Sequence, residues 1–354
     1  MKKILMKTVQ IYEQIIIRYT LPILWPLISK ILRGVSKKTI FIEPKSYIFN
    51  EVVVFTNSNA RPKKRSLNYD ILAKNWARNS LKISKVHVKS QLQEHSPDTY
   101  ILTNEWFKSK KQHLYFFIPA IHLALRIRKK KKPVWILIGD TYNLKIVIPA
   151  SILVALCGGS IVLQQNTKVD GEKFGIVHVS GPHFWLFTSA NLDDFKSDIR
   201  WEMRKKILVI AASGDLNRLK FLEKNRDKLE TLNYDIIETK HQYNWQQYRK
   251  ILKDSRVNIN SSLLQEHVIR QNYWIKRKLS KFTVTNRVWE GFCSGALVLT
   301  DDNPVLQFYG FKPNKHFLDL EEIEKSNFDL PDELTSARIA ESGRKKFMLD
   351  VVKV

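Results

Sequence analysis

The segment RVWEGFCSGALVLTD, residues 287–301, constrains the fold most strongly, because it joins a helix to a buried strand over a short distance. Arg287 and Glu290 lie three residues apart, so both project from one face near the start of the predicted helix. Gly295 is expected to take the left-handed conformation that ends a helix. The apolar run 296–300 is typical of a parallel strand covered on both faces. The segment predicts a helix–strand step of a parallel α/β sheet. Its Arg–Glu pair is a candidate for ligand binding, and a surface ion pair on an ordinary helix is the alternative.

Alternating strand and helix patterns precede this segment in both halves of the chain. Downstream of residue 200, the expected elements are strand 207–212, helix 216–232, strand 235–237, helix 244–253 and strand 257–260. In the first half, strands are expected at 52–55, 99–103, 134–138 and 160–164. This alternation predicts an α/β protein with two Rossmann-like, doubly wound domains, over residues 48–185 and 200–330.

The remaining parts of the chain lie outside the alternation. Residues 174–206 interrupt it and are expected to connect the two domains, where clefts commonly form. A helix over 335–349, within the terminal segment 335–354, is expected to dock back on the first domain.

Two apolar stretches raise the question of a membrane segment. In residues 1–40, charged residues and two prolines interrupt every long apolar run, so no membrane-spanning helix is expected. The mixture of Trp, aliphatic and basic residues fits a helix lying in a membrane interface, and it fits a capping helix packed on the fold equally well. Residues 146–167 carry no charge, but Pro149 and the pair Gly158 and Gly159 divide them. A buried helix followed by a strand is therefore predicted there.

The net charge of +25 is the unusual feature of the composition. It predicts an anionic partner, which is a phosphate-rich ligand, a nucleic acid or the acidic face of a membrane. The two cysteines, Cys157 and Cys293, lie far apart in apolar contexts. We therefore expect neither a disulfide framework nor a Cys-rich metal site, and we expect a reducing compartment.

Polar residues at the predicted strand ends are the candidates for ligand binding, because open parallel sheets bind ligands beyond the carboxyl ends of their strands. Ser213 and Gly214 enter a helix whose free N–H groups suit a phosphate, and Arg218 follows one turn later. Asn260 ends another predicted strand. A turn, an exposed cation and a polar bend are the structural alternatives. The predicted ligand-binding residues are Ser213, Gly214, Arg218, Asn260, Arg287 and Glu290.

The segment 285–301 also resembles a known signature. Its Arg287 and Glu290 open a helix, a small residue and Gly295 end that helix, and an apolar strand ends at Asp301. This arrangement is similar to the C-terminal signature of GT-B glycosyltransferases, in the branch related to spore-maturation protein CgeB and the group 1 transferases. The similarity covers the second domain, and the first domain matches only as a generic nucleotide-fold half.

The resemblance implies two Rossmann-like domains facing a cleft and transfer of a sugar from a nucleotide-sugar donor. In the family pattern Glu290 contacts the ribose and Arg287 the diphosphate. The group 1 pattern has another glutamate where this chain has Phe282, so the donor sugar stays open. Cations and helix ends stabilise the leaving diphosphate in such enzymes, so no metal or other cofactor is expected. We interpret Asp301 and Asp302 as part of a loop beside the donor.

The general base has the weakest sequence signal. Inverting transfer needs a carboxylate or an imidazole near the acceptor hydroxyl. The catalytic candidates, which come from the predicted first domain, are Glu105, Asp140 and His183. A structural role is the alternative for each of them, and a retaining enzyme needs no such base. The stereochemistry therefore stays open.

Together these features predict a metal-independent, hexosyltransferase-type glycosyltransferase in the bacterial cytoplasm, at the inner face of the membrane. The expected partners are a nucleotide sugar, a cell-surface glycan or lipid-linked acceptor, and an anionic membrane surface. One alternative is a basic nucleic-acid-binding protein that uses residues 129–132 and 271–281, although no nucleic-acid module is recognisable. Another is a glycosyltransferase-like protein that binds its ligand without catalysis.

Overall fold

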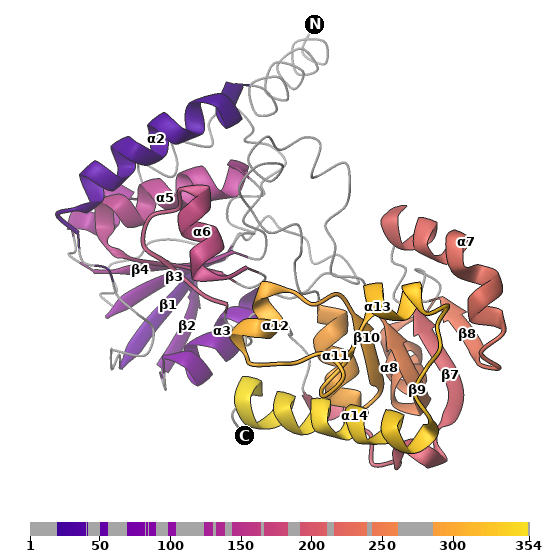
Figure 1. The fold of residues 1–354 in the computed structure, drawn as a ribbon. Coiled ribbons are helices and arrows are strands. Elements are labelled where there is room, and N and C mark those ends of the chain that lie inside the picture. Colours follow the sequence, from indigo (N-terminus) through magenta and orange to yellow (C-terminus); the bar gives the residue numbers. More distant parts are fainter. Residues whose placement is uncertain are drawn as a thin grey trace, which may run out of the picture. The chain divides into compact units, whose positions relative to one another are not determined.

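The computed structural model contains two compact units, each built on a parallel β-sheet (Figure 1). The first unit comprises Met1–Ser189 and Arg270–Leu279, and the second comprises Ala190–Ile269 and Ser280–Val354. The structure describes residues 20–39, 41, 50–55, 69–81, 83, 85–89, 98–103, 124–129, 132–138, 144–163, 166–182, 192–210, 216–238, 243–260 and 286–352.

In the described part of the first unit, six parallel strands form one sheet in the order β2-β1-β3-β4-β5-β6. They are β1 (Glu51–Phe55), β2 (Lys85–Lys89), β3 (Thr99–Thr103), β4 (Val134–Ile138), β5 (Gly159–Leu163) and β6 (Val179–Ser180). The central strands β3, β4 and β5 are buried along their whole length, as expected for a parallel sheet covered on both faces. Strand β6 lies in the segment that we expected to connect the domains. Its two residues are too few to show a strand pattern in the sequence.

Helices cover the first sheet. Helix α3 (Tyr69–Ser80) buries Trp76 against Trp135 of β4, with the two ring centroids 5.6 Å apart. Helix α5 (Leu144–Cys157) joins β4 to β5 and is almost entirely buried. The prediction of a buried helix followed by a strand in the uncharged stretch is thus confirmed. Among the described helices, none combines the length and the apolarity needed to cross a bilayer.

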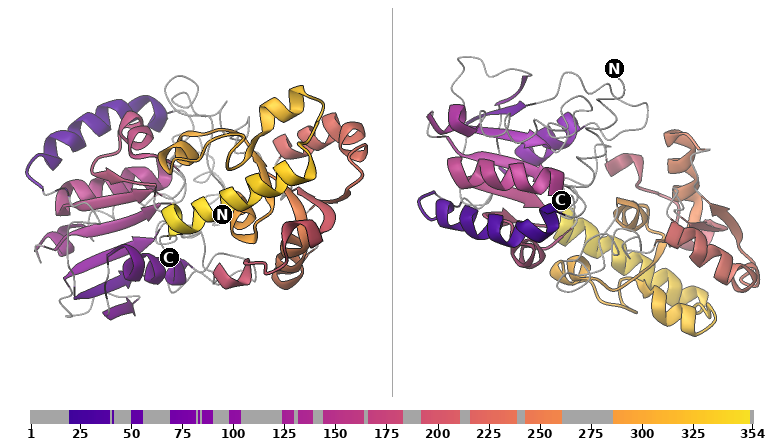
Figure 2. Two further views of the ribbon diagram at one scale, coloured as in Figure 1. Left: turned by 60° about the horizontal axis from the view of Figure 1, so that its bottom comes forward. Right: turned by 90° about the horizontal axis from the view of Figure 1, so that it is seen from above.

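Helix α2 (Leu21–Ser36) lies alongside α5 (Figure 2). Its inward face buries Trp25, whose indole N–H donates a hydrogen bond to the carbonyl oxygen of Phe174. Phe174 ends the short helix α6 (Lys168–Phe174). Arg33 strengthens the same contact, because its Nη2 donates to the carbonyl oxygen of Glu172 at 2.9 Å. The alternative of a capping helix packed on the fold is therefore correct for this face of α2.

In the described part of the second unit, five parallel strands form a sheet in the order β11-β10-β9-β7-β8. They are β7 (Lys205–Ile210), β8 (Asp235–Glu238), β9 (Ser255–Ile259), β10 (Leu297–Thr300) and β11 (Leu318–Asp319). Numbered along the chain within each unit, both sheets share the order 2-1-3-4-5 over their first five strands. In this order the chain changes direction across the sheet between the first and third strands, and ligands bind at that point. In the second sheet it lies between β7 and β9.

Helices cover both faces of the second sheet, which confirms the doubly wound prediction. Helices α7 (Leu216–Glu230) and α14 (Glu333–Lys346) contribute buried side chains to a core with one face of β7, β9 and β10. Helices α8 (Trp245–Asp254) and α11 (Asn286–Ser294) contact each other and cover the other face. We expected the terminal helix to dock on the first domain. It lies on the second sheet, because Ile339 and Ala340 are buried in that core.

Candidate functional site

Two helices begin at the carboxyl edge of the second sheet. Because the strands are parallel, each helix between them starts where one strand ends and returns to the opposite edge. Helix α8 returns from β8 to β9, and α11 leads into β10. Asn244 caps α8, since its side chain accepts a hydrogen bond from the backbone N–H of Gln247 at 2.9 Å. Gly295 ends α11 at φ +74°, as the sequence predicted. The first turns of α8 and α11 are thereby held at the ligand-binding edge.

Three side chains from these first turns meet. Arg287 Nη1 donates to Glu290 Oε2 at 2.9 Å, and the Tyr248 hydroxyl donates to the same oxygen at 2.8 Å. The Arg287 guanidinium carbon lies 4.1 Å from the centre of the Tyr248 ring, in cation–π contact. The two residues that the sequence singled out are therefore together, and Tyr248 holds both. We call Tyr248, Arg287 and Glu290 the α11 triad.

The α11 triad is mostly buried. Glu290 is only 5% exposed, whereas the Arg287 side chain keeps 25% of its surface accessible. Burial raises the pKa of Tyr248 far above its ordinary value, and the neighbouring Glu290 raises it further. Burial acts to lower the pKa of Arg287, but the Glu290 carboxylate outweighs it and the net pKa is raised. Tyr248 therefore remains a neutral donor and Arg287 a cation at any physiological pH.

Close packing on β9 holds α11 in place. A Cβ atom on Gly291 would lie 2.6 Å from Asn258 Nδ2, so only glycine fits this close approach of helix and strand. Asn258 is fully buried, and its Nδ2 donates to the carbonyl oxygen of Arg287 at 3.3 Å. Its Oδ1 has no hydrogen-bond partner in the part of the chain that the structure describes. The contact of Gly291 with Asn258 thus fixes α11 on β9 and positions the α11 triad.

The predicted residue Asn260 lies at the same edge, directly after β9. It is 1% exposed, and its backbone N–H donates to the carbonyl oxygen of Leu299 in β10 at 2.9 Å. Ser213 and Gly214 lie outside the described residues. Arg218 lies in the first turn of α7, but its side chain is not among those described. The structure therefore places Asn260 at the edge and leaves the other three contacts as predictions.

The loop after β10 has a structural role. Asn303 caps helix α12 (Pro304–Phe308), because its Oδ1 accepts from the backbone N–H groups of Val305 and Leu306. Asp302 Oδ2 accepts from Gln307 Nε2 at 2.9 Å. In the described ranges, no group of three or more His, Cys, Asp or Glu residues is placed to hold a metal ion.

The sequence missed Tyr248, although a signal for its position exists. Asn244 and Gln247 form a capping box, which fixes where α8 begins. Tyr248 follows in the first turn, at the edge where a ligand is expected. The candidates for a general base, Glu105, Asp140 and His183, all lie outside the described residues.

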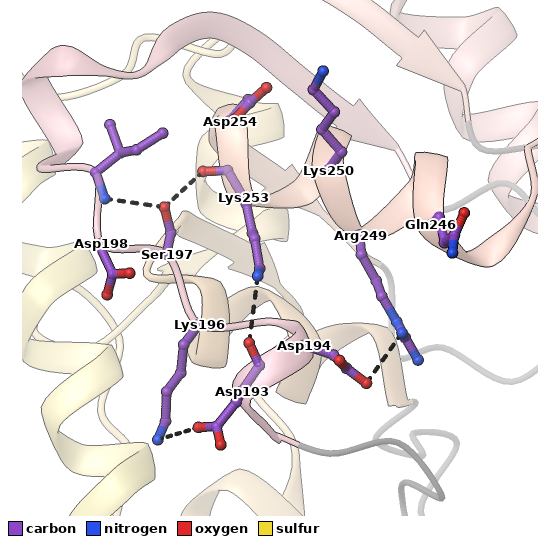
Figure 3. Close-up of a pocket in the computed structure, with 11 residues that line it drawn as sticks. Asp193, Asp194, Lys196, Ser197, Asp198, Gln246, Arg249, Lys250, Lys253 and Asp254 are labelled. Carbon is purple, nitrogen blue, oxygen red and sulfur yellow. Dashed lines mark hydrogen bonds and ion pairs between the residues drawn. The ribbon is translucent and has the colours of Figure 1, made fainter.

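A groove of about 580 Å³ lies beside α8, and no member of the α11 triad lines it (Figure 3). Its charged side chains pair with one another, as in Lys196–Asp193 at 2.7 Å and Arg249–Asp194 at 3.0 Å. Four cations and four carboxylates line it, so an anionic ligand would gain no net attraction there. The lining residues are Asp193, Asp194, Lys196, Ser197, Asp198, Ile199, Gln246, Arg249, Lys250, Lys253 and Asp254. The groove is therefore a weaker candidate for an anionic ligand than the α11 triad.

Comparison with known proteins gives similarity of structure only. No protein-family model matches the chain, and no curated protein matches it in sequence. Anabaena HepE, solved with UDP and glucose, is 9% identical, with a TM-score of 0.46 over 86% of this chain and 96% of HepE.

Two further solved structures are similar to the same degree. An α1,3-fucosyltransferase with GDP-fucose is 8% identical, with a TM-score of 0.44 over 89% of this chain and 88% of that one. A glycosyltransferase from Rickettsia africae is 11% identical, with a TM-score of 0.45 over 86% of this chain and 95% of that one. Identities this low concern the fold and carry no ligand over. The solved structures that resemble this chain thus include glycosyltransferases.

Proposed function

We propose that this chain is a glycosyltransferase whose nucleotide-sugar donor binds at the carboxyl edge of the second sheet. One observation supports this most. Among the described residues, only Oε2 of the buried Glu290 has hydrogen-bond donors, and Oε1 has none. Oε1 is thus left to accept a hydrogen bond from a ligand hydroxyl, and hydrogen bonds to a charged acceptor are the stronger ones. The α11 triad is therefore suited to a ligand that supplies hydroxyl groups next to negative charge.

Each member of the α11 triad has a role in this proposal. Glu290 Oε1 accepts a hydrogen bond from a ribose hydroxyl. Arg287 uses its accessible surface to bind the diphosphate, because a planar guanidinium matches phosphate oxygens. Tyr248 positions both through its hydroxyl and its ring. The positive charge of Arg287 stabilises the leaving diphosphate, so the transfer needs no metal ion. Asn260, Ser213, Gly214 and Arg218 complete the donor site.

The acceptor side of the proposal rests on charge and on the first unit. A net charge of +25 favours binding to the anionic cytoplasmic face of a bacterial membrane. The acceptor there is a lipid-linked or cell-surface glycan. The general base of an inverting reaction comes from Glu105, Asp140 or His183. A nucleic-acid-binding protein and a non-catalytic donor-binding protein are the competing functions, and the test below separates them.

Calorimetry and thermal shift with UDP, GDP, CDP and their common sugars test the donor site. We expect one nucleotide series to bind, and Glu290→Gln to weaken that binding by roughly ten- to hundredfold, because a hydrogen bond to a charged group contributes about 1.5–3 kcal/mol. Glu333→Gln is the matched control. Glu333 also pairs with an arginine of the second unit, Arg256 of β9 at 2.8 Å, but it lies in α14 and is exposed. It should leave donor affinity unchanged.

The outcomes distinguish the three functions. Equal donor affinity in folded wild type and Glu290→Gln would remove Glu290 from the site. A protein that binds the donor but neither transfers the sugar to an acceptor nor hydrolyses the donor to free sugar would be non-catalytic. No nucleotide binding, together with polynucleotide binding that falls steeply as salt rises, would favour the nucleic-acid-binding function.

A further inference from the structure

Helix α2 has two faces of opposite character. The inward face buries Trp25, Ser29, Leu32 and Ser36 against the first unit. The outward face carries large apolar side chains that are between 42% and 76% exposed, namely Ile23, Leu24, Leu27, Ile31 and Val35. We call these five residues the α2 stripe. Outside α2, only Leu125 and Val169 expose a large hydrophobic side chain among the described residues of the first unit.

The α2 stripe is continuous along the helix. Ile23, Leu27, Ile31 and Val35 follow at intervals of four residues, and side chains at this spacing lie above one another on one helical face. An exposed apolar patch of this kind marks an interaction surface, because single exposed apolar residues are ordinary but a row of them is not. The other face of α2 packs on the first unit, so the helix holds the α2 stripe in a fixed position.

A row of cations borders the α2 stripe. Lys30, Arg33 and Lys37 lie on the flank between the stripe and the buried face, at helical spacings of three and four residues, and all three are exposed. Lys38 follows directly after the helix and is exposed as well. No acidic residue occurs in α2. The surface therefore combines apolar side chains with positive charge alone.

We infer that the α2 stripe and its cations are the surface by which the chain docks on an anionic lipid bilayer. Such a helix lies in the plane of the interface, with its apolar side chains among the acyl chains and its cations at the lipid phosphates. Its 16 residues are too few to span the bilayer. A second copy of the chain is disfavoured as the occupant, because two identical cationic rows would face each other.

This inference deepens the proposed membrane placement and shares no residue with the donor site, so the two can fail separately. The test is co-sedimentation of the full chain with vesicles of phosphatidylcholine alone, and with vesicles of equal parts phosphatidylcholine and phosphatidylglycerol. We expect binding to the anionic vesicles, and a loss of at least about tenfold in the double variant Leu27→Glu/Ile31→Glu, because two apolar side chains no longer leave water.

The matched control is Leu334→Glu/Leu349→Glu. It changes the same charge at two exposed leucines of the second unit and should keep vesicle binding. Lys30→Gln/Lys37→Gln should weaken binding only to the anionic vesicles, and less so at high salt. Far-UV circular dichroism and denaturant unfolding, measured on every variant, check that each one is folded.

Three results would overturn the inference. One is equal vesicle binding in the wild type and in Leu27→Glu/Ile31→Glu. Another is no binding of the wild type to either vesicle, as expected if another part of the chain covers the stripe. The third is a dimer of the wild type that this double variant dissolves, with no vesicle binding, which would assign the stripe to a second copy.

Discussion

Helices α11 and α2 invert the usual distribution of side chains in opposite ways. Every residue of α11 from Val288 to Ser294 is buried, and these include the carboxylate of Glu290. Helix α2 does the reverse, because it leaves the five apolar residues of the α2 stripe exposed although its other face is packed. Buried charge and exposed apolar surface both raise the free energy of the folded chain when no partner is bound.

The difference indicates what each helix binds. A ligand for α11 has to bring hydrogen-bond donors, since the exposed part of the α11 triad is polar. A partner for α2 has to remove apolar surface from water and bring negative charge. The two helices belong to different units, so each surface can be altered without touching the other. Substitutions in one helix should therefore leave the other unchanged.

Trp25→Ala should cause the largest loss, about 3–5 kcal/mol, as for other buried tryptophans truncated to alanine. The substitution removes the ring that packs against Phe174, at a centroid distance of 6.2 Å, and the indole hydrogen bond. Denaturant unfolding followed by far-UV circular dichroism measures it. Leu27→Ala, on the exposed face of the same helix, should stay within about 0.5 kcal/mol of wild type. Equal losses in the two variants would show that the two faces of α2 are not distinct.

Glu290→Ala should destabilise the second unit by about 3 kcal/mol, at the low end for a broken buried ion pair because Arg287 keeps some solvent. Chemical denaturation measures the loss, and Glu333→Ala is the exposed control, which should lose much less because exposed ion pairs contribute little. A loss equal to that of the control would mean that the α11 triad contributes nothing to folding.

The two helical glycines should respond with opposite signs. Gly291→Ala places a Cβ atom 2.6 Å from Asn258 Nδ2 and should cost about 1–3 kcal/mol by overpacking. Gly34→Ala, in α2, meets nothing within 4 Å and should stabilise its helix by about 0.5–1 kcal/mol. Thermal unfolding of both variants checks the pair. A neutral Gly291→Ala would show that α11 can shift away from β9 without loss.

Tyr248→Phe should have the smallest effect on stability, about 1 kcal/mol, because Glu290 keeps Arg287 as one of its two donors. Donor affinity should fall less than in Glu290→Gln, since Tyr248 positions the other two members and does not itself contact the ligand. Isothermal calorimetry on the same samples measures this order. Tyr243→Phe, at the half-buried position just before α8, is the control. A larger loss of affinity in Tyr248→Phe than in Glu290→Gln would place Tyr248 in direct contact with the donor.

Much of the second unit could be predicted from the sequence because its signals are local. The end of α11 at Gly295 and the buried strand after it follow from backbone sterics and from the run of apolar residues. The buried helix α5 could be predicted because a proline and two glycines divide the uncharged stretch in which it lies. Strand β6 could not be predicted, because two residues are too few to show the alternation of a strand. The terminal helix packs on the second sheet and not where we expected it, because an amphipathic pattern does not specify which surface the helix packs on.

The sequence by itself determined most of the longer helices and strands, though not their exact ends, and that they alternate into parallel sheets. Only the tertiary structure decided which side chains meet. Tyr248 and Glu290 are 42 residues apart, and they touch because the strand order brings α8 and α11 together on one face of the sheet. Packing against α5 and α6 likewise decided which face of α2 is buried. Local patterns follow from the period and sterics of the backbone, whereas contacts between distant segments follow from how the crossovers arrange them.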